Sequence, residues 1–300
     1  MKVMISGSGG MLATALIDDM LAQPGIEKIY ALSSNPAAVL KRHHVDPRLE
    51  AVDFDRAAEV LSSEECDVLV HAAFPRQNDS NSIAEGLEHT KRLLSLVLPS
   101  CAAIHISSQS VYDPARTTPA TEDSGMENPS SPYSVAKFYS EQLVFDLCPG
   151  SKVSNIRLAS LVAPEFEDRF INKLIRNGLQ TGEVSVFGSN NQFGFLDIAD
   201  AADAITTMVL QSDSKDWQKV YNVGPHQKSY SLEEIASRVK EAIEKCGRPC
   251  SLSVSLKDQA SSSGLDSTRF EQDFSWESQK TLDDTIKDII DYQLVQIWDF

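Results

Sequence analysis

Short apolar runs alternate with longer amphipathic stretches in the first half of the chain. The apolar runs predict buried strands at 3–6, 28–32, 67–71, 102–106 and 153–157. The longer stretches repeat apolar residues at helical spacing and predict helices at 11–22, 82–98 and 133–147. Because strands and helices alternate along the chain, the pattern predicts an α/β fold built on a Rossmann-type, doubly wound parallel sheet.

The second half of the chain is more mixed. Its periodicity predicts helices at 170–177, 198–211 and 231–244 and a short strand at 251–255. Ser231 and Glu234 form a capping-box pattern that opens the last of these helices. Since no clean linker separates the halves, we expect two closely packed parts. These are a Rossmann domain over 1–157 and a smaller C-terminal α/β subdomain over 158–300, with 195–225 returning to the Rossmann domain.

Composition narrows the classes of partner. A net charge of −16 repels phosphate backbones, so we expect no nucleic-acid partner. No apolar run approaches the roughly 20 residues that cross a bilayer, so we expect no membrane association. Five cysteines without paired spacing, and an N-terminus unlike a signal peptide, favour a reducing cytoplasm. Cys246 and Cys250 lack the partners of a zinc set, so we expect no metal site.

A glycine-rich turn follows the first predicted strand. Gly7 permits a tight turn, Gly10 lets the backbone approach a ligand, and Ala13 lets the following helix pack closely on the strand. The first amides of that helix, with the positive end of its dipole, would then face an anionic group. The turn therefore predicts binding of the pyrophosphate of a dinucleotide.

Tyr133 and Lys137 lie four residues apart, directly after Pro132, a residue favoured at helix starts. Four-residue spacing puts both side chains on one helical face, where the ammonium favours the tyrosinate and suits Tyr133 to proton transfer. Ser108 follows the strand predicted at 102–106, and reactive groups in doubly wound sheets collect where strands end. The three residues predict a catalytic site.

The joint order of these motifs resembles the extended short-chain dehydrogenases/reductases, the NAD-dependent epimerase/dehydratase family of nucleotide-sugar enzymes. The resemblance implies cofactor contacts from Gly7, Gly10, Met11, Leu12, Ser33, Ser34, Asp53, Phe54, His71, Ala72, Ala73 and Lys137. It also implies a substrate site in the C-terminal subdomain and at the ends of the sheet strands. Its expected residues are Ser108, Gln109, Ser160, Lys173, Arg176 and Arg269.

The resemblance further implies a mechanism and an assembly. A nicotinamide cofactor passes a hydride to or from a carbon that bears oxygen, while Tyr133 moves the matching proton. Lys137 holds the cofactor ribose and Ser108 orients the substrate oxygen.

Residues 221–224 and 274–276 correspond to late strands of the family. A homodimer through the helices predicted at 82–98 and 133–147 is also implied.

The chain departs from the family at several positions. Ser33 stands where an acid usually holds the ribose of NAD, and Lys41 and Arg42 follow, so NADP is favoured over NAD. Gln109 and Ser110 replace the Asp-Glu pair of sugar dehydratases, which argues against 4,6-dehydration. Two glycines stand at other family positions: Gly86 aligns with an asparagine, and Gly194 with an arginine that binds the diphosphate.

We therefore expect a NAD(P)-dependent epimerase or ketoreductase that acts on a sugar or, more specifically, a nucleotide sugar. Two alternatives stay open. One is an NADPH-dependent reductase of small non-nucleotide aldehydes or ketones. The other is a cofactor-binding sensor without catalysis, against which the intact set of Tyr133, Lys137 and Ser108 argues.

Overall fold

The computed structural model describes residues 1–43, 45–63, 65–75, 77–126, 128–129, 131–257 and 261–298. Seven parallel strands form the main sheet, in the order β11-β6-β5-β4-β1-β2-β3. They are β1 (Lys2–Ser6), β2 (Lys28–Leu32), β3 (Leu49–Val52), β4 (Val68–His71), β5 (Ala102–Ser108), β6 (Val153–Leu158) and β11 (Val220–Val223). The order runs outward in both directions from β1, so the fold is a doubly wound α/β sheet, as the sequence predicted.

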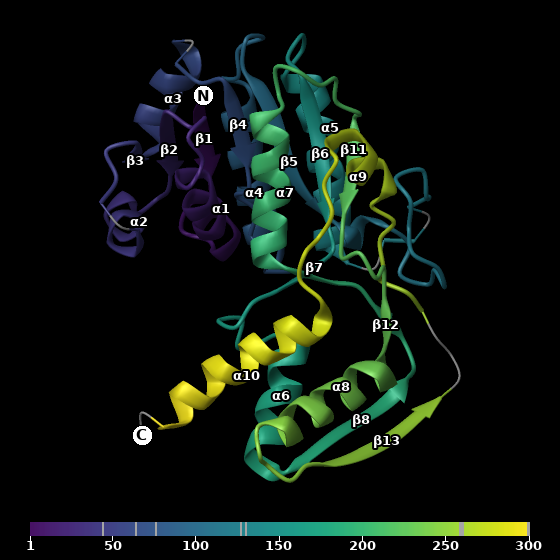
Figure 1. The fold of residues 1–300 in the computed structure, drawn as a ribbon. Coiled ribbons are helices and arrows are strands. Elements are labelled where there is room, and N and C mark those ends of the chain that lie inside the picture. The colour runs from purple at the N-terminus through teal and green to yellow at the C-terminus, as the bar shows by residue number, and fades with distance from the viewer. Residues whose placement is uncertain are drawn as a thin grey trace.

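Helices cover both faces of this sheet (Figure 1). They are α1 (Met11–Leu21), α2 (Pro36–Arg42), α3 (Phe54–Ser62), α4 (Ser80–Leu94), α5 (Pro132–Leu147) and α7 (Ile198–Leu210), with a single turn of 3-10 helix at Gln109–Val111. α1 packs against α7, and α4 packs against α5. The helix predicted at 82–98 ends at Leu94, and the one predicted at 133–147 begins one residue earlier, at Pro132.

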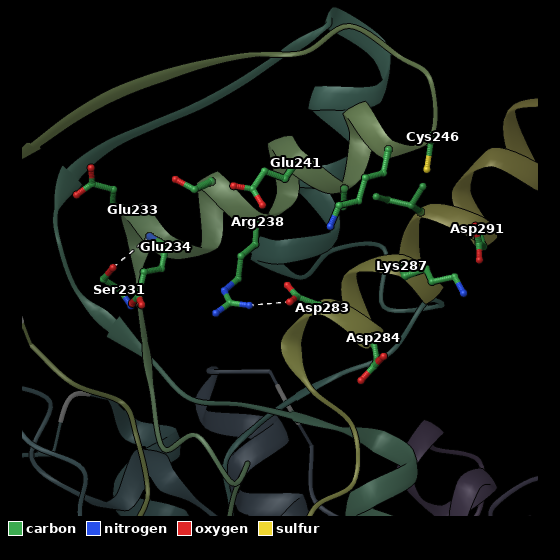
Figure 2. A pocket seen from close by; sticks show the side chains of 14 residues that line it. Ser231, Glu233, Glu234, Arg238, Glu241, Cys246, Asp283, Asp284, Lys287 and Asp291 are labelled. Carbon is green, nitrogen blue, oxygen red and sulfur yellow. Dashed lines mark hydrogen bonds and ion pairs between the residues drawn. The ribbon is translucent and has the colours of Figure 1, made fainter.

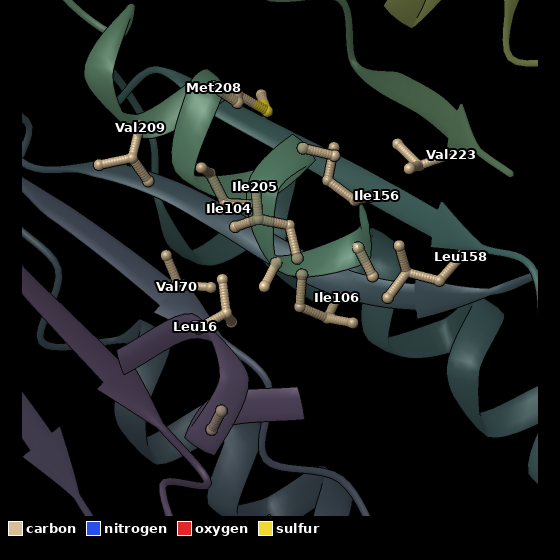
Figure 3. Packing of buried hydrophobic residues seen from close by; sticks show 14 of the residues in the cluster. Leu16, Val70, Ile104, Ile106, Ile156, Leu158, Ile205, Met208, Val209 and Val223 are labelled. Atoms are coloured by element: carbon tan, nitrogen blue, oxygen red, sulfur yellow. The ribbon is translucent and has the colours of Figure 1, made fainter. Parts of the chain in front are cut away.

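Side chains along each strand alternate between two hydrophobic cores. Val3 and Ile5 of β1 belong to the core under α1 and α7, whereas Met4 belongs to the core under α3, α4 and α5. Figure 3 shows Ile205 of α7 against Ile104 of β5, in the first of these cores. Burial on both faces explains why the strands read as continuous apolar runs.

The C-terminal part forms a smaller α/β unit below the main sheet (Figure 1). Its helices are α6 (Phe170–Thr181), α8 (Leu232–Lys245) and α10 (Leu282–Trp298). α6 and α8 pack on a parallel pair of strands, β8 (Glu183–Ser189) and β13 (Ser251–Lys257), and α10 packs on these two helices. Short strands pair as β7 (Ser160–Val162) with β10 (Phe195–Asp197), and β9 (Gln192–Phe193) with β12 (Tyr230–Ser231). The chain enters this unit after β6 and rejoins the main sheet through α7 and β11. The domain boundaries stay a prediction.

One expected strand is a helix end. Phe274, at the start of the stretch 274–276, closes α9 (Thr268–Phe274), and Ser275 has a left-handed φ of 53° that ends the helix. Phe270 and Phe274 lie one helical turn apart, and both rings contact the buried ring of Tyr221 in β11. Burying both rings on one face of the helix stabilises α9 up to Phe274, so the helix takes the first residue of the expected strand. Within the described residues, no helix is long and apolar enough to cross a membrane.

Candidate active site

The glycine turn joins β1 to α1 at the carboxyl edge of the sheet. Gly7 has a φ of +76°, and a Cβ atom there would lie 2.8 Å from the Cα of Ala73, so only glycine fits between these two segments. The Gly10 amide donates a hydrogen bond to the Gly7 carbonyl at 2.8 Å, which closes the turn. No side chain caps the start of α1 at Met11. An uncapped helix N-terminus that lines a hollow suits the pyrophosphate of a dinucleotide.

The predicted catalytic residues line one hollow of about 580 Å³, which we call the Tyr133 hollow. It brings together Gly7, Gly10, Met11, Leu12 and Ala72 from the cofactor set and Ser108, Gln109, Tyr133, Lys137 and Ser160 from the chemical set. These residues come from the ends of several strands and the first turns of α1 and α5. The glycine turn and the Tyr-Lys pair therefore meet in space, as their order in the sequence implied.

Phe74 was not among the expected site residues, yet it touches both members of the catalytic pair. Its ring stands edge-on to the Tyr133 ring, 5.9 Å between centres, and the Lys137 Nζ lies 4.5 Å from the centre of the same ring. Phe74 directly follows Ala73 at the end of β4, and that position at a strand end was the signal available in the sequence. We infer that Phe74 limits the movement of Tyr133 and Lys137.

Lys137 is almost fully buried, and its Nζ donates a hydrogen bond to the Ile106 carbonyl at 2.6 Å. Burial lowers the pKa of Lys137 to about 7, while the nearby carboxylate of Glu141 acts in the opposite direction. A lysine with this pKa can change its charge near neutral pH. The position suits the predicted function of tuning Tyr133, because both side chains line the same hollow.

Ser108 ends β5 and faces the same hollow. Its Oγ accepts a hydrogen bond from the Ser110 amide at 3.2 Å, which fixes the hydroxyl at the turn. The neighbouring Gln109 accepts a hydrogen bond from the Arg116 guanidinium at 2.8 Å. Its amide oxygen is thus held by a cation, and an amide does not titrate, so Gln109 cannot supply an acid or a base to the hollow.

A second hollow of about 560 Å³, the Ser33 hollow, adjoins the first at Gly7, Gly10, Ala72 and Phe74. It is lined by Ser33, Ser34, Asp53, Phe54 and Ala73 from the expected cofactor set, and by His89 and Arg92, which the sequence did not suggest. The guanidinium of Arg92 lies 4.3 Å from the centre of the Phe54 ring. The shared lining residues place the two hollows side by side at the glycine turn.

Asp53 lines the Ser33 hollow, and Arg42 contacts Gly9, another of its lining residues. Asp53 accepts a hydrogen bond from the Arg56 amide at 3.0 Å and so caps α3. Arg42, in the last turn of α2, donates from Nη1 to the Gly9 carbonyl at 2.6 Å. An arginine therefore lies against the glycine turn, on the side where Ser33 replaces the expected acid.

His71 differs from its expected position. It is buried beneath both hollows, where it bonds to Ser6 Oγ at 2.6 Å and to Thr90 Oγ1 at 2.9 Å and stacks on His105, 5.3 Å between ring centres. Burial, and next the charge of Lys137, hold the pKa of His71 well below its usual value. His71 therefore does not line the site, and its contacts support β4 from below.

The three basic residues expected at the substrate lie outside the Tyr133 hollow. Lys173 and Arg176 pair with the acids just before α6, at 3.5 Å to Asp168 and 3.6 Å to Glu167. Arg269 pairs with Asp123 at 2.7 Å and approaches Glu122. Among the described residues that line the hollow, Arg169 is the one guanidinium. It directly precedes α6, and it was not among the basic residues that the sequence led us to expect.

Both glycine departures have a steric cause. A Cβ atom at Gly194 would lie 2.9 Å from the Lys228 carbonyl and 3.1 Å from the Cα of Gly264, so an arginine side chain has no room there. A Cβ atom at Gly86 in α4 would collide with the ring of Pro75. At Gly194 residues distant in the sequence fill the space, and at Gly86 the segment that precedes the same helix fills it, so neither position can take the polar side chain that the resemblance suggested.

A larger hollow, of about 800 Å³, lies between α8 and α10 in the C-terminal part. Figure 2 shows its charged lining and the ion pair between Arg238 and Asp283, at 2.7 Å. Glu234 faces Ser231 in the capping box that the sequence predicted. None of the residues expected at the cofactor or the substrate lines this hollow, so its size does not make it the active site.

The model of the NAD-dependent epimerase/dehydratase family matches residues 3–224. The chain belongs to this family. The match spans the glycine turn, the segments that line the Tyr133 hollow and the return of the chain to the sheet at β11, whereas residues 274–276 and Arg269, which also entered the resemblance, lie beyond it in this epimerase/dehydratase family member. No curated protein matches the chain.

Solved structures share the fold of this family member at low sequence identity. UDP-glucuronic acid 4-epimerase from Bacillus cereus in complex with NAD has a TM-score of 0.80 at 19% identity, over 99% of this chain and 100% of that one. The dTDP-glucose 4,6-dehydratase from Streptomyces venezuelae with NAD bound has a TM-score of 0.78 at 20% identity, over 99% and 98%. UDP-N-acetylglucosamine 4-epimerase from Bacillus cereus has a TM-score of 0.75 at 18% identity, over 98% and 99%. At these identities the likeness establishes the fold.

Proposed function

We propose that this protein is a nicotinamide-dependent epimerase or ketoreductase that acts on a carbon bearing a hydroxyl or keto group in a nucleotide sugar. The observation that carries the proposal is the shared lining of one hollow by the glycine turn, Ser108, Tyr133 and Lys137. Family relatives of similar fold act on nucleotide sugars, as their names state. The proposal extends that substrate class to this chain.

The residues divide the chemistry among them. When bound, the nicotinamide supplies or accepts a hydride at the substrate carbon. Tyr133 gives or takes the proton at the oxygen on that carbon, and Ser108 donates a hydrogen bond that holds this oxygen. Lys137, with a pKa of about 7, supplies positive charge near the phenol and favours its ionised form. The amides at the start of α1 hold the pyrophosphate.

NADP is the cofactor that the Ser33 hollow suits best. A carboxylate that would repel a 2′-phosphate is missing at Ser33, and Arg42 donates to the adjacent Gly9 carbonyl. An arginine fork can bind a phosphate through two parallel hydrogen bonds. Two of the relatives named above were solved with NAD, so the preference for NADP rests on the residues of this chain and not on those relatives.

The reaction is epimerisation or reduction and not 4,6-dehydration. Dehydration needs an acid for the leaving hydroxyl and a base for a carbon-bound proton, and Gln109, held by Arg116, supplies neither. Epimerisation or reduction at one carbon needs only Tyr133, Ser108 and the cofactor. A relative of similar fold is a dehydratase, so the product must be determined directly.

The experiment incubates the purified protein with NADP or NAD and a panel of nucleotide sugars, including UDP-glucuronic acid and dTDP-glucose. A thermal-shift screen first finds ligands that stabilise the protein by mass action. Mass spectrometry and NMR then identify the product, while nicotinamide absorbance separates a net reduction from an epimerisation. Detection of a 4-keto-6-deoxy product contradicts the proposal. Stabilisation by cofactor without turnover of any substrate supports the sensor alternative.

The crowding at Gly194 favours a second candidate. Because this position has no room for an arginine, the chain lacks the usual diphosphate contact there. A reductase of small aldehydes or ketones needs no such contact. Turnover of simple carbonyls at rates equal to those of nucleotide sugars would favour this second function.

A further inference from the structure

Strand β13 forms an open edge of the C-terminal part. It pairs in parallel with β8 alone among the described strands, and Figure 1 shows it at the outer margin of the molecule. Leu252 and Val254 are 37% and 40% exposed, although both are apolar. An exposed strand of this length with apolar side chains is a template for pairing with another strand, and proteins usually cover such an edge.

The hydrogen bonds to β8 reveal which backbone groups of β13 point outward. The Ser251 amide donates to the Gly182 carbonyl, and the Lys257 carbonyl accepts from the Asn190 amide. Since successive residues of a parallel strand face opposite sides, Ser253 and Ser255 also face β8. The backbone groups of Leu252, Val254 and Leu256 therefore face the open edge.

The sequence of β13 reads nearly the same from either end of the strand. It reads Ser-Leu-Ser-Val-Ser-Leu-Lys, with Val254 at the centre. When two such strands run antiparallel about a twofold axis at Val254, Val254 faces its own copy and Leu252 faces the copy's Leu256. In this register the outward backbone groups of both strands meet, so each facing pair exchanges both of its N–H···O=C bonds.

We propose that two copies of this chain pair through β13 in this antiparallel register and form a continuous sheet in the order β8-β13-β13-β8. The apolar side chains of the strand then cover one another on the face toward α8, which packs on β13 within each chain. Such an interface is isologous, as expected for a C2 dimer.

Charge supports the same register. Glu183 pairs with Ser251 across the β8–β13 ladder, and Lys257 lies at the opposite end of β13, about 20 Å away within one chain. Antiparallel pairing sets Lys257 opposite the second copy's Ser251, about 10 Å from that copy's Glu183 across two strand spacings. Both side chains are exposed and point to the same face of the sheet. In its own chain Glu183 accepts a hydrogen bond from the Ser185 hydroxyl at 2.8 Å, and neither Glu183 nor Lys257 takes part in an ion pair among the described residues, so the pairing gives each a partner of opposite charge.

The test must separate this edge from the helix surface implied by the family resemblance. Val135 and Phe138 on α5 are 50% and 38% exposed, and charges in the variant Val135→Glu/Phe138→Glu prevent apolar association there. In this background, sedimentation velocity over a concentration series measures the remaining association. The proposal expects a species of twice the 33.0 kDa chain mass, which the added variant Val254→Asp removes. Val295→Asp, the same change at an exposed valine on α10, is the matched control and leaves the mass unchanged.

A charge exchange keeps the test independent of folding defects. Lys257→Glu and Glu183→Lys each weaken the dimer by about tenfold, and the double exchange restores it. Glu183→Lys is the more informative of the two variants. It reduces the net negative charge of the chain, so it would strengthen a dimer that is limited only by general charge repulsion, whereas the proposal expects it to weaken the dimer. A 33.0 kDa species at every concentration in the α5-charged background overturns the proposal. So does a dimer that Val254→Asp or either single charge reversal leaves unchanged.

Discussion

Glu141 and Arg157 form a buried ion pair with two hydrogen bonds, which ties helix α5, the helix of Tyr133 and Lys137, to strand β6. The Arg157 Nη2 lies 2.7 Å from Glu141 Oε2, and the Arg157 Nε lies 2.9 Å from Oε1. Ser107 at the end of β5 donates to the same carboxylate, and the Tyr112 hydroxyl lies 2.9 Å from Arg157 Nη1. One carboxylate thus fixes α5 against two strands, one helical turn beyond Lys137.

Removal of one member of this pair should destabilise the protein strongly. Glu141→Gln leaves the Arg157 guanidinium buried without its charge partner, and breaking a buried pair in this way costs about 3–5 kcal/mol in the free energy of unfolding. Urea denaturation measures the loss. The double variant Glu141→Leu/Arg157→Met removes both charges and should lose less than the single variant, whereas an equal or larger loss would contradict this account.

Tyr133→Phe should abolish turnover while it spares cofactor binding. The variant removes only the hydroxyl that moves the proton, and general acid–base catalysis is worth about 10²–10⁴-fold in rate. Steady-state kinetics and cofactor titration by fluorescence check the two parts. Tyr139→Phe, an exposed tyrosine on the same helix, is the control. More than about a tenth of the wild-type kcat in Tyr133→Phe would exclude Tyr133 as the proton-transfer residue.

Lys137 should make stability depend on pH between about 7 and the usual lysine range. Its pKa falls from 10.5 to about 7 on folding, because burial disfavours the charged form. Between these values the unfolded chain binds the extra proton, so unfolding free energy rises with pH across this window and the penalty is complete below about 7. Urea denaturation of wild type and Lys137→Met at pH 7, 8 and 9 isolates this contribution. The unfolding free energy of the wild type relative to that of Lys137→Met should increase as pH rises. A difference that stays constant from pH 7 to pH 9 would contradict this prediction.

Arg42→Ala should weaken NADP binding and spare NAD. Loss of charge-assisted hydrogen bonds to a 2′-phosphate corresponds to about 10–100-fold in dissociation constant. Isothermal titration with both cofactors measures the change, and Lys245→Ala, which removes an exposed cation on α8 outside both hollows, is the control. Tenfold tighter binding of NAD than of NADP by the wild-type protein would reverse the proposed preference.

Arg169→Ala should raise KM for an anionic substrate, whereas Arg269→Ala should not. Arg169 lines the Tyr133 hollow, and a hydrogen bond to a charged group is worth about 1.5–3 kcal/mol. Arg269 is held by Asp123, so its loss should act on stability and leave KM in place. The reverse result, with KM raised only in Arg269→Ala, would restore the assignment made from sequence.

The sequence by itself determined the local features of this site. The alternation of apolar runs with amphipathic stretches was enough to predict the doubly wound sheet, because strands that are buried on both faces must be apolar throughout. Gly7 and Gly10 predicted a tight turn, and the four-residue spacing of Tyr133 and Lys137 placed their side chains on one face of a helix. These features depend only on residues that are close together in the sequence, so the sequence alone is enough to predict them.

The tertiary structure decided which side chains reach the hollows. His71 lies beneath the site because Thr90 and Ser6 bind both of its ring nitrogens. Gly194 excludes an arginine because the Lys228 carbonyl and Gly264 occupy the space. Arg169, and not Arg269, lines the hollow because acids more than a hundred residues away hold Arg269. Each outcome depends on distances between segments far apart in the sequence, and only the packing of the whole chain fixes those distances.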